Sequence, residues 1–233
     1  MTTTLITGAN KGLGFETARQ LVAAGHTVYA AARNKDNAER AAKELGARPI
    51  VLDVTDDDSI QSAAAHIAQE HGALDVLVNN AGIPGTRAGQ PAGDITGADI
   101  AAVLDTNVVG IVRVLHAFLP LLERSSNGVV VNVGSGMGSF GRVQDPDRIE
   151  SHPHNPAYSA SKAAVSMLTV QYAMAYPNLR INVADPGPTS TDLNAFQASR
   201  TVEQGAVAIV RAAQITPGGP TGTFFDGEGT SPW

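Results

Sequence analysis

Short apolar segments alternate with longer segments of helical periodicity along almost the whole chain. This alternation constrains the fold more than any other feature. The segments with the composition of β-strands are residues 3–7, 27–31, 48–54, 74–80, 128–134, 180–185 and 222–225. Several are apolar throughout, as is typical of strands buried on both faces of a parallel sheet. Strands that alternate with helices predict right-handed βαβ units in a doubly wound sheet.

The predicted helices lie between these strands, at residues 12–24, 56–71, 97–123, 156–175 and 202–214. Thr55 is the expected N-cap of the second helix, because acidic residues follow it in the first turn. Pro120 is expected to kink or end the third helix. No linker and no internal repeat divides the chain. We therefore expect one α/β domain over residues 1–233, a Rossmann-type fold with about seven parallel strands and helices on both faces.

Composition excludes several classes of function. The formal net charge of −6 gives no electrostatic support for binding to nucleic acid or to an anionic membrane. The chain has no cysteine, which excludes disulfides, thiolate chemistry and cysteine-ligated metal. No uninterrupted apolar window reaches the roughly 18 residues that a membrane span needs, and the N-terminus lacks a targeting pattern. We therefore expect a cytoplasmic protein with no nucleic-acid or membrane partner.

A glycine-rich turn follows the first strand, in the sequence TLITGANKGLG. Gly8, Gly12 and Gly14 have the spacing GxxxGxG, which differs from GxGxxG but serves the same purpose. Small residues let the backbone approach a pyrophosphate, and the N-terminus of the next helix supplies free N–H groups and a positive dipole end. An ordinary glycine-rich turn is the alternative, which the position after the first strand disfavours.

The end of the second strand indicates which dinucleotide this turn would hold. An acidic residue commonly binds the adenosine 2′-hydroxyl of NAD at this point, whereas the 2′-phosphate of NADP needs a cation. Here Ala31 and Ala32 are followed by Arg33, whose planar guanidinium suits a phosphate. Lys11, in the glycine turn, is a second candidate for the same phosphate. Together they favour NADP(H) over NAD(H).

Tyr158 and Lys162 are the candidate catalytic pair. Residues four apart lie on one face of a helix, so the two side chains can be neighbours. A free tyrosine has a pKa near 10, and a neighbouring ammonium group would lower it towards neutrality. Ser135 follows the fifth strand, at the edge where doubly wound sheets bind ligands. Reduction of a ketone develops charge on oxygen, so a hydroxyl donor and an acid must converge there.

Seven motifs in register resemble the short-chain dehydrogenase/reductase family, and the resemblance covers essentially the whole chain. They are TGANKGLG, LDV with Asp53, NNAG at 79–82, DTNVVG with Asn107, VVNVGS ending at Ser135, YSASK at 158–162 and DPGPTST at 185–191. The glycine loop, with AAR after the second strand, is most similar to the carbonyl-reductase-like, NADPH-preferring members.

The resemblance implies a role for each matching position. Ser135 would hydrogen-bond the substrate carbonyl and Tyr158 would protonate it. Lys162 would hold the nicotinamide ribose and lower the pKa of Tyr158, and Asn107 would bind a water that relays protons to Lys162. The implied cofactor contacts are Gly8, Asn10, Lys11, Gly12, Leu13, Gly14, Arg33, Asp53, Val54, Asn80, Ala81, Gly82, Tyr158, Lys162, Pro186, Gly187, Thr189 and Thr191.

The chain departs from the family pattern in two places. Tyr158 follows Ser135 by 23 residues, more than in most members, and the extra segment within 136–157 is polar and rich in proline. Because the usual tetramer uses helices flanking this segment, we expect a monomer or homodimer. His152 and His154 lie in it, but no further ligand-like cluster supports a metal site, so we expect none. The segment after PGPTST is short, which suggests an open pocket, with Met137, Phe140, Phe196 and Trp233 as candidate apolar wall residues.

The preferred interpretation is an NADPH-dependent oxidoreductase that reduces a ketone or aldehyde reversibly, with a small-molecule carbonyl or alcohol as its partner. The first alternative is a non-enzymatic NADP(H)-binding regulator. The presence of Asn107, Ser135, Tyr158 and Lys162 together argues against it. The second is a nucleotide-sugar epimerase or dehydratase, although such chains are usually longer.

Overall fold

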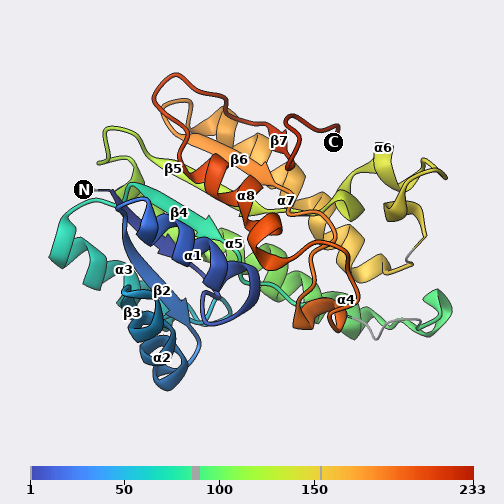
Figure 1. Cartoon of the computed structure of the whole chain (residues 1–233), viewed down its shortest axis with the longest axis horizontal. Coiled ribbons are helices and arrows are strands. Elements are labelled where there is room, and N and C mark those ends of the chain that lie inside the picture. The colour runs from blue at the N-terminus through green and yellow to red at the C-terminus, as the bar shows by residue number, and fades with distance from the viewer. Residues whose placement is uncertain (1, 86–89, 153) are drawn as a thin grey trace.

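Seven parallel strands form one sheet in the order β3-β2-β1-β4-β5-β6-β7 in the computed structural model, which describes residues 2–85, 90–152 and 154–233 (Figure 1). The strands are β1 Thr3–Ile6, β2 Thr27–Ala32, β3 Arg48–Val51, β4 Val76–Asn79, β5 Val129–Val133, β6 Arg180–Ala184 and β7 Phe224–Phe225. Strands β2 and β3 are added on one side of β1, and β4 to β7 on the other. The switch between β1 and β4 is where a ligand-binding crevice is expected, at the carboxyl ends of these two strands.

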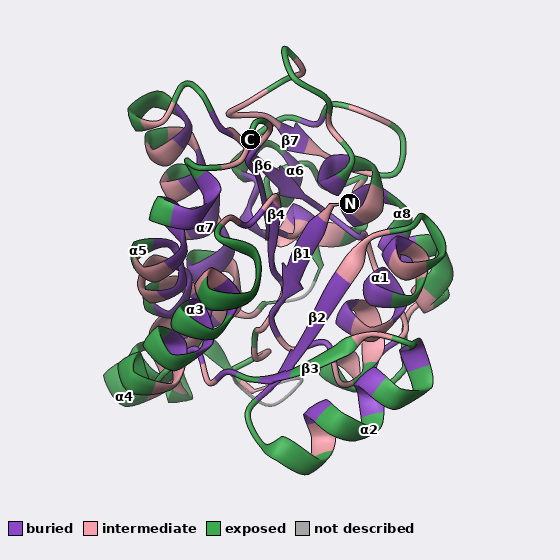
Figure 2. Ribbon diagram, turned by 90° about the vertical axis from the view of Figure 1, so that its left-hand side faces the viewer, coloured by how far each residue is buried: buried purple, intermediate pink, exposed green. Residues whose placement is uncertain are grey.

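Helices cover both faces of the sheet. The α-helices are α1 Gly12–Ala23, α2 Lys35–Leu45, α3 Asp57–His71, α4 Gly97–Leu104, α5 Gly110–Leu122, α6 Phe140–Val143, α7 Pro156–Ala175 and α8 Val202–Ala213. Figure 2 shows the buried strands between α1, α2 and α8 on one side and α3, α5 and α7 on the other. Each face has its own apolar core, one around Phe118 of α5 and one around Leu21 of α1. Large side chains buried in this way contribute about 1.5–3 kcal/mol each.

All seven predicted strands and all five predicted helical segments are present in the described residues, and the α/β doubly wound fold is confirmed. Helix α2 forms at residues 35–45, where no helix is predicted from the sequence. Its borders carry the missed signals. The side chain of Asn34 caps the N-terminus by accepting from the Asn37 N–H, and Gly46 ends the helix with φ of 67°.

Two details of the helix prediction were wrong. Asp56, rather than Thr55, is the N-cap of α3, and it accepts from the N–H groups of Asp58 and Ser59. The segment 97–122 is interrupted at a π-helical turn, Asp105–Val109, whereas α5 continues through Pro120 to its end. Pro120 has no N–H to bond the carbonyl four residues back, and α5 ends two residues after it. The π turn that contains Asn107 changes the hydrogen-bond spacing earlier in the same helical segment.

The segment Gly97–Leu122 is long and apolar enough, by length and composition, to cross a membrane. Its buried side chains, among them Val114 and Phe118, nevertheless belong to the core between α5 and the sheet. Core helices of globular proteins pass the same length and composition test, so this segment carries no argument for a membrane span.

Candidate active site

Three glycines shape the turn between β1 and α1. Gly8 and Gly12 have φ of 64° and 56°, in the left-handed region that favours glycine. A Cβ on Gly14 would lie 2.4 Å from Asn80 Nδ2 and 2.5 Å from the Gly8 carbonyl oxygen, so no side chain fits there. Among the described residues, no side chain caps the first turn of α1. The turn therefore presents backbone N–H groups at a helix N-terminus, which is the arrangement that binds phosphate.

Asn80 and Ala81 hold this turn from the neighbouring strand β4. Asn80 Nδ2 donates to the carbonyl oxygens of Thr7 at 2.9 Å and Gly8 at 3.1 Å. The backbone N–H groups of Asn80 and Ala81 both donate to Thr7 Oγ1 at 3.0 Å. The side-chain amide of Asn80 thus supports the turn directly, a structural role that the resemblance did not assign to it.

The residues predicted around the adenosine lie at the ends of β2, β3 and β4. Arg33 is exposed directly after β2 and has no salt-bridge partner among the described residues. Asp53 is half-buried after β3, and its Oδ1 accepts from the backbone and hydroxyl of Thr55. Val54 is buried, and a Cβ on Gly110 would lie 3.0 Å from it. Asn10 and Leu13 are half-buried in the glycine turn.

Lys11 forms an exposed ion pair with Asp192, a residue of the segment that follows β6. The ammonium group predicted to reach a 2′-phosphate is therefore paired across the opening of the turn. Thr191 lies on the same side, because a Cβ on Gly12 would be 3.7 Å from Thr191 Cγ2. The segment after β6 thus closes over the glycine turn.

That segment begins with Pro186 and Gly187, whose φ is 66°. Asp185 Oδ1 accepts from the Gly187 N–H at 2.8 Å, and Thr189 Oγ1 donates to the Pro186 carbonyl at 3.1 Å. These bonds fix the turn at the carboxyl end of β6, beside β5. The predicted nicotinamide contacts Pro186, Gly187, Thr189 and Thr191 are therefore ordered side by side.

Ser135 and Tyr158 meet beyond the carboxyl end of β5. Ser135 begins a short 3₁₀ turn, and its Oγ accepts from the Met137 N–H at 3.2 Å. Tyr158 lies in the first turn of α7, which Asn155 caps by accepting from the Tyr158 N–H at 3.1 Å. The pKa of Tyr158 is raised to about 12, with burial as the largest cause and the Asp185 carboxylate as the second, while a hydrogen bond with Ser135 opposes both.

Lys162 lies one helical turn after Tyr158 and is buried. Its Nζ donates to the Val133 carbonyl at the end of β5 at 2.7 Å and lies 5.5 Å from the centre of the Tyr158 ring. Burial lowers the pKa of Lys162 to about 8, and Asp185 opposes that shift. Burial is the largest cause of the raised pKa of Tyr158, and the lowering of that pKa by Lys162 stays a prediction.

Asn107 lies in the π-helical turn and is buried. Its Oδ1 accepts from the Ile83 N–H at 2.8 Å. Its Nδ2 donates to the Ile83 carbonyl and to Ser161 Oγ, both at 3.0 Å. The amide therefore ties the loop after β4 to α7, one residue before Lys162. Gly82 lies against it, since a Cβ there would be 3.3 Å from Asn107 Oδ1.

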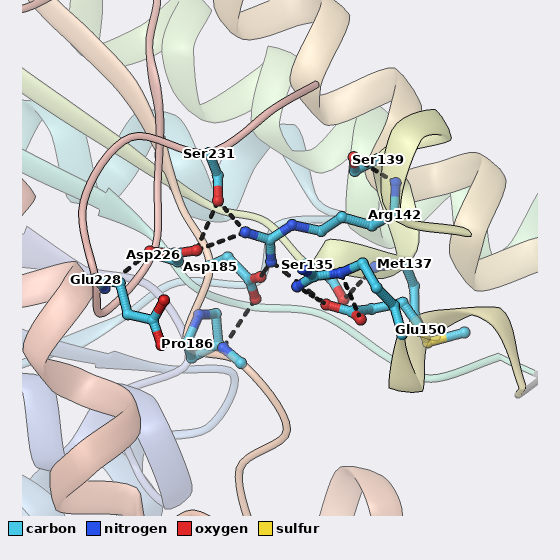
Figure 3. Close-up of polar contacts among 12 residues, drawn as sticks. Ser135, Met137, Ser139, Arg142, Glu150, Asp185, Pro186, Asp226, Glu228 and Ser231 are labelled. Atoms are coloured by element: carbon cyan, nitrogen blue, oxygen red, sulfur yellow. Dashed lines mark hydrogen bonds and ion pairs between the residues drawn. The ribbon is translucent and has the colours of Figure 1, made fainter. Parts of the chain in front are cut away.

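A buried ion cluster lies beside the site, and the sequence analysis missed it (Figure 3). Its centre is Arg142 of α6, whose guanidinium contacts Asp185 at 3.0 Å, Asp226 at 2.5 Å and Glu150 at 3.4 Å. It also donates to the Ser231 hydroxyl. These partners come from three separate parts of the chain. The only local signal was an arginine in a segment that otherwise looked like a polar loop.

The polar, proline-rich segment within 136–157 is partly ordered into short helices, including α6. Of residues 83–96, which are rich in turn-forming residues, 86–89 lie outside the described part of the chain. His152 and His154 are exposed, and the described residues contain no group of metal-ligating side chains. Among the candidate wall residues, Phe140 and Phe196 are exposed, and Trp233 stacks on Phe224 with ring centres 5.7 Å apart.

Comparison with known proteins agrees with this geometry. The family model described as short chain dehydrogenase matches residues 2–201. A short-chain dehydrogenase of Penicillium roqueforti, anuI, is 38% identical over 242 residues, covering 97% of this chain and 94% of that protein. The (-)-isopiperitenone reductase of Mentha piperita is 30% identical and covers 95% of each chain.

Among solved structures, the NADPH-bound carbonyl reductase from chicken fatty liver superposes with a TM-score of 0.87. It is 26% identical, and the match covers 100% of this chain and 99% of that one. The parallel sheet and its flanking helices are thus shared with an enzyme of known cofactor content over their full length.

Proposed function

The chain belongs to the short-chain dehydrogenase family of nicotinamide-dependent oxidoreductases, and from that premise we propose that it is an NADPH-dependent reductase of ketones or aldehydes. The observation that carries this proposal is the convergence of Ser135, Tyr158 and Lys162 beyond β5. The relatives named as reductases support the same direction of reaction.

The residues of the chain fit the cofactor. The glycine turn and the uncapped N-terminus of α1 would hold the pyrophosphate. Arg33 would bind the 2′-phosphate, and Lys11 would add a second cation if it left Asp192. Asp53 and Val54 would face the adenine, and the turn at Pro186 and Gly187 would hold the nicotinamide end. Bound NADPH would supply the hydride.

The side chains would act on the substrate oxygen. The Ser135 hydroxyl would donate a hydrogen bond to the carbonyl, which stabilises the charge that develops there. Tyr158 keeps its proton at neutral pH, because burial raises its pKa to about 12, and it would give that proton to the forming alkoxide. Lys162 would bind the ribose hydroxyls while its Nζ stays anchored to Val133.

Asn107 and the π-helical turn that contains it would support this set. Both N–H bonds of its amide are already used, by Ile83 and Ser161, so its side chain would act by holding α7 in place. A relay water would bind at an acceptor oxygen of the π-helical turn, where the wider spacing weakens the helical hydrogen bonds. The cytoplasmic location and the monomeric or dimeric state stay predictions.

The test is oxidation of NADPH and of NADH, in parallel, with a panel of aldehydes, ketones, β-keto esters and quinones. We expect turnover with NADPH and much less with NADH, because Arg33 offers a cation and no acid follows β2. Tight NADPH binding with no turnover on any carbonyl would contradict the proposal and would favour the regulator alternative.

A further inference from the structure

Asp185, the first residue after β6, carries a buried charge that the reaction proposed above leaves without a role. It is 2% exposed. Its Oδ2 accepts from Arg142 Nη1 at 3.0 Å and its Oδ1 accepts from the Gly187 N–H at 2.8 Å. A buried carboxylate costs several kcal/mol unless it is paired. The hydrogen bonds from Arg142 and Gly187 are therefore what favour the charged form of this carboxyl group.

The sheet places that charge next to the anchor of Lys162. Val133, whose carbonyl accepts from Lys162 Nζ, pairs with Ala184 across β5 and β6. The Gly134 N–H donates to the Ala184 carbonyl at 2.9 Å, which extends the pairing by one residue. Asp185 directly follows Ala184. The carboxylate and the ammonium group thus lie at the same edge of two adjacent strands.

We propose that Asp185 is a positioning residue of the active site, and that its carboxylate, held by Arg142, is the counter-charge that keeps Lys162 an ammonium ion. The inference deepens the proposed function, because it rests on the role given there to Lys162. Reduction requires a cationic Lys162 and a protonated Tyr158, and a nearby negative charge favours both of these protonation states.

The titration directions agree with this geometry. Burial lowers the pKa of Lys162 to about 8 and Asp185 opposes it, so loss of the carboxylate would bring the lysine closer to neutrality or below. For Tyr158, burial raises the pKa and Asp185 adds to the rise. In both groups the charge of Asp185 acts to retain a proton.

Arg142 matters because two acidic side chains of the cluster, Glu150 and Asp226, favour the protonated form of Asp185. Burial is the largest influence and raises the pKa of Asp185, and Glu150 and Asp226 add to the rise. The Gly187 N–H and Arg142 oppose it but leave the pKa above its usual value. The other charged groups near this edge are Tyr158 and Lys162 on α7, Arg148 through Glu150, and Arg200, which donates to the Pro186 carbonyl at 3.3 Å. Without Arg142, the carboxyl group would tend to take up a proton.

The test is a direct titration of Lys162. The chain has only four lysines, so ¹³C-lysine labelling of the full chain gives few ¹³Cε–¹Hε signals, and Lys162→Met assigns the buried one. We expect the pH midpoint of the Lys162 titration to fall by roughly one pH unit or more in Asp185→Asn. An unchanged midpoint in folded Asp185→Asn would overturn the proposal.

Asp226→Asn is the matched control. Asp226 binds the same guanidinium, but Asp185, rather than Asp226, is the carboxylate that opposes the lowering of the Lys162 pKa. We expect its Lys162 midpoint to stay near that of the wild type. Equal shifts in both variants would indicate general loosening of the cluster and would also overturn the proposal.

A double variant covers the case in which Asp185→Asn does not fold. Arg142→Met with Asp185→Asn removes both partners and leaves no unpaired buried guanidinium. Its Lys162 midpoint must again be lower than in the wild type. In NADPH oxidation assays, the basic limb of the kcat/KM profile should move to lower pH in the same variants. The absence of any carbonyl turnover in the wild type would contradict the proposed function alone, because the titration needs no turnover.

Discussion

Different interactions stabilise the two ends of the crevice. At the cofactor end, the glycine turn is fixed by sterics and by hydrogen bonds to its nearest neighbours, such as those from Asn80 to Thr7 and Gly8. At the substrate end, one buried guanidinium, Arg142, joins α6, the end of β6 and the chain after β7. The first arrangement is insensitive to charge, whereas the second depends on it. The comparison predicts that variants at the two ends fail in different ways.

The largest difference is expected from Tyr158→Phe, which removes the acid and leaves the ring. A positioned general acid contributes about 10²–10⁴-fold to rate, so turnover should fall by roughly that factor. The glycine turn is untouched, so NADPH affinity should stay within a few-fold of the wild type. Steady-state kinetics and cofactor fluorescence titration measure the two quantities. Near-normal turnover would remove Tyr158 from its proposed role.

Arg142→Met should cost the most stability. The substitution leaves buried carboxylates without their cation, and breaking a buried pair in this way costs about 3–5 kcal/mol. Chemical denaturation of both proteins measures the loss. Lys35→Met is the matched control, because the Lys35–Glu39 ion pair lies within α2 and both of its side chains are more than half exposed. Such pairs contribute less than about 1 kcal/mol. Equal losses in the two variants would contradict the central role of the cluster.

Arg33→Asp should change cofactor choice while it leaves the substrate end intact. Loss of a charged hydrogen bond to phosphate, plus repulsion, should weaken NADPH binding by roughly 10- to 100-fold. NADH, which lacks the phosphate, should lose little. Arg40→Asp, an exposed position on α2, makes the same change of charge away from the end of β2. Equal weakening of NADPH and NADH would contradict the 2′-phosphate contact.

The same contrast explains what could be predicted from the sequence. The glycine turn, the strands and the pair of Tyr158 and Lys162 are local patterns with fixed spacing, so periodicity and motif sufficed. The pKa of Tyr158 could not be predicted, because it depends on burial that only the packed fold creates. The cluster around Arg142 was equally hidden, since its partners Asp185 and Asp226 are 43 and 84 residues away along the chain. The only sign of the π-helical turn in the sequence was Asn107, because asparagine is disfavoured in the interior of a helix.

The smallest expected effect is a pH response confined to the substrate end. Burial raises the pKa of Asp226, but hydrogen bonds from Ser231 and Arg142 outweigh it and lower the pKa to about 2. An acid whose folded pKa lies below its unfolded value contributes stability above the unfolded pKa, near 4, and loses it as pH falls towards 2. The gap in unfolding free energy between wild type and Asp226→Asn, on the order of 1–2 kcal/mol at pH 6, should therefore close between pH 4 and pH 2.

Hydrogen exchange can locate this loss. Asp226 Oδ1 accepts from the N–H groups of Glu228 and Gly229 at 2.8 and 3.0 Å, so these amides report on the carboxylate directly. Comparison of wild type with Asp226→Asn at each pH cancels the intrinsic pH dependence of exchange. We expect the protection of these two amides to converge in acid, while the Ala9 N–H, which donates to the Ala31 carbonyl at the glycine turn, stays protected in both proteins. Equal acid loss at both ends would mean that the two halves of the crevice are not held independently, because the glycine turn is fixed by sterics and by hydrogen bonds to its nearest neighbours.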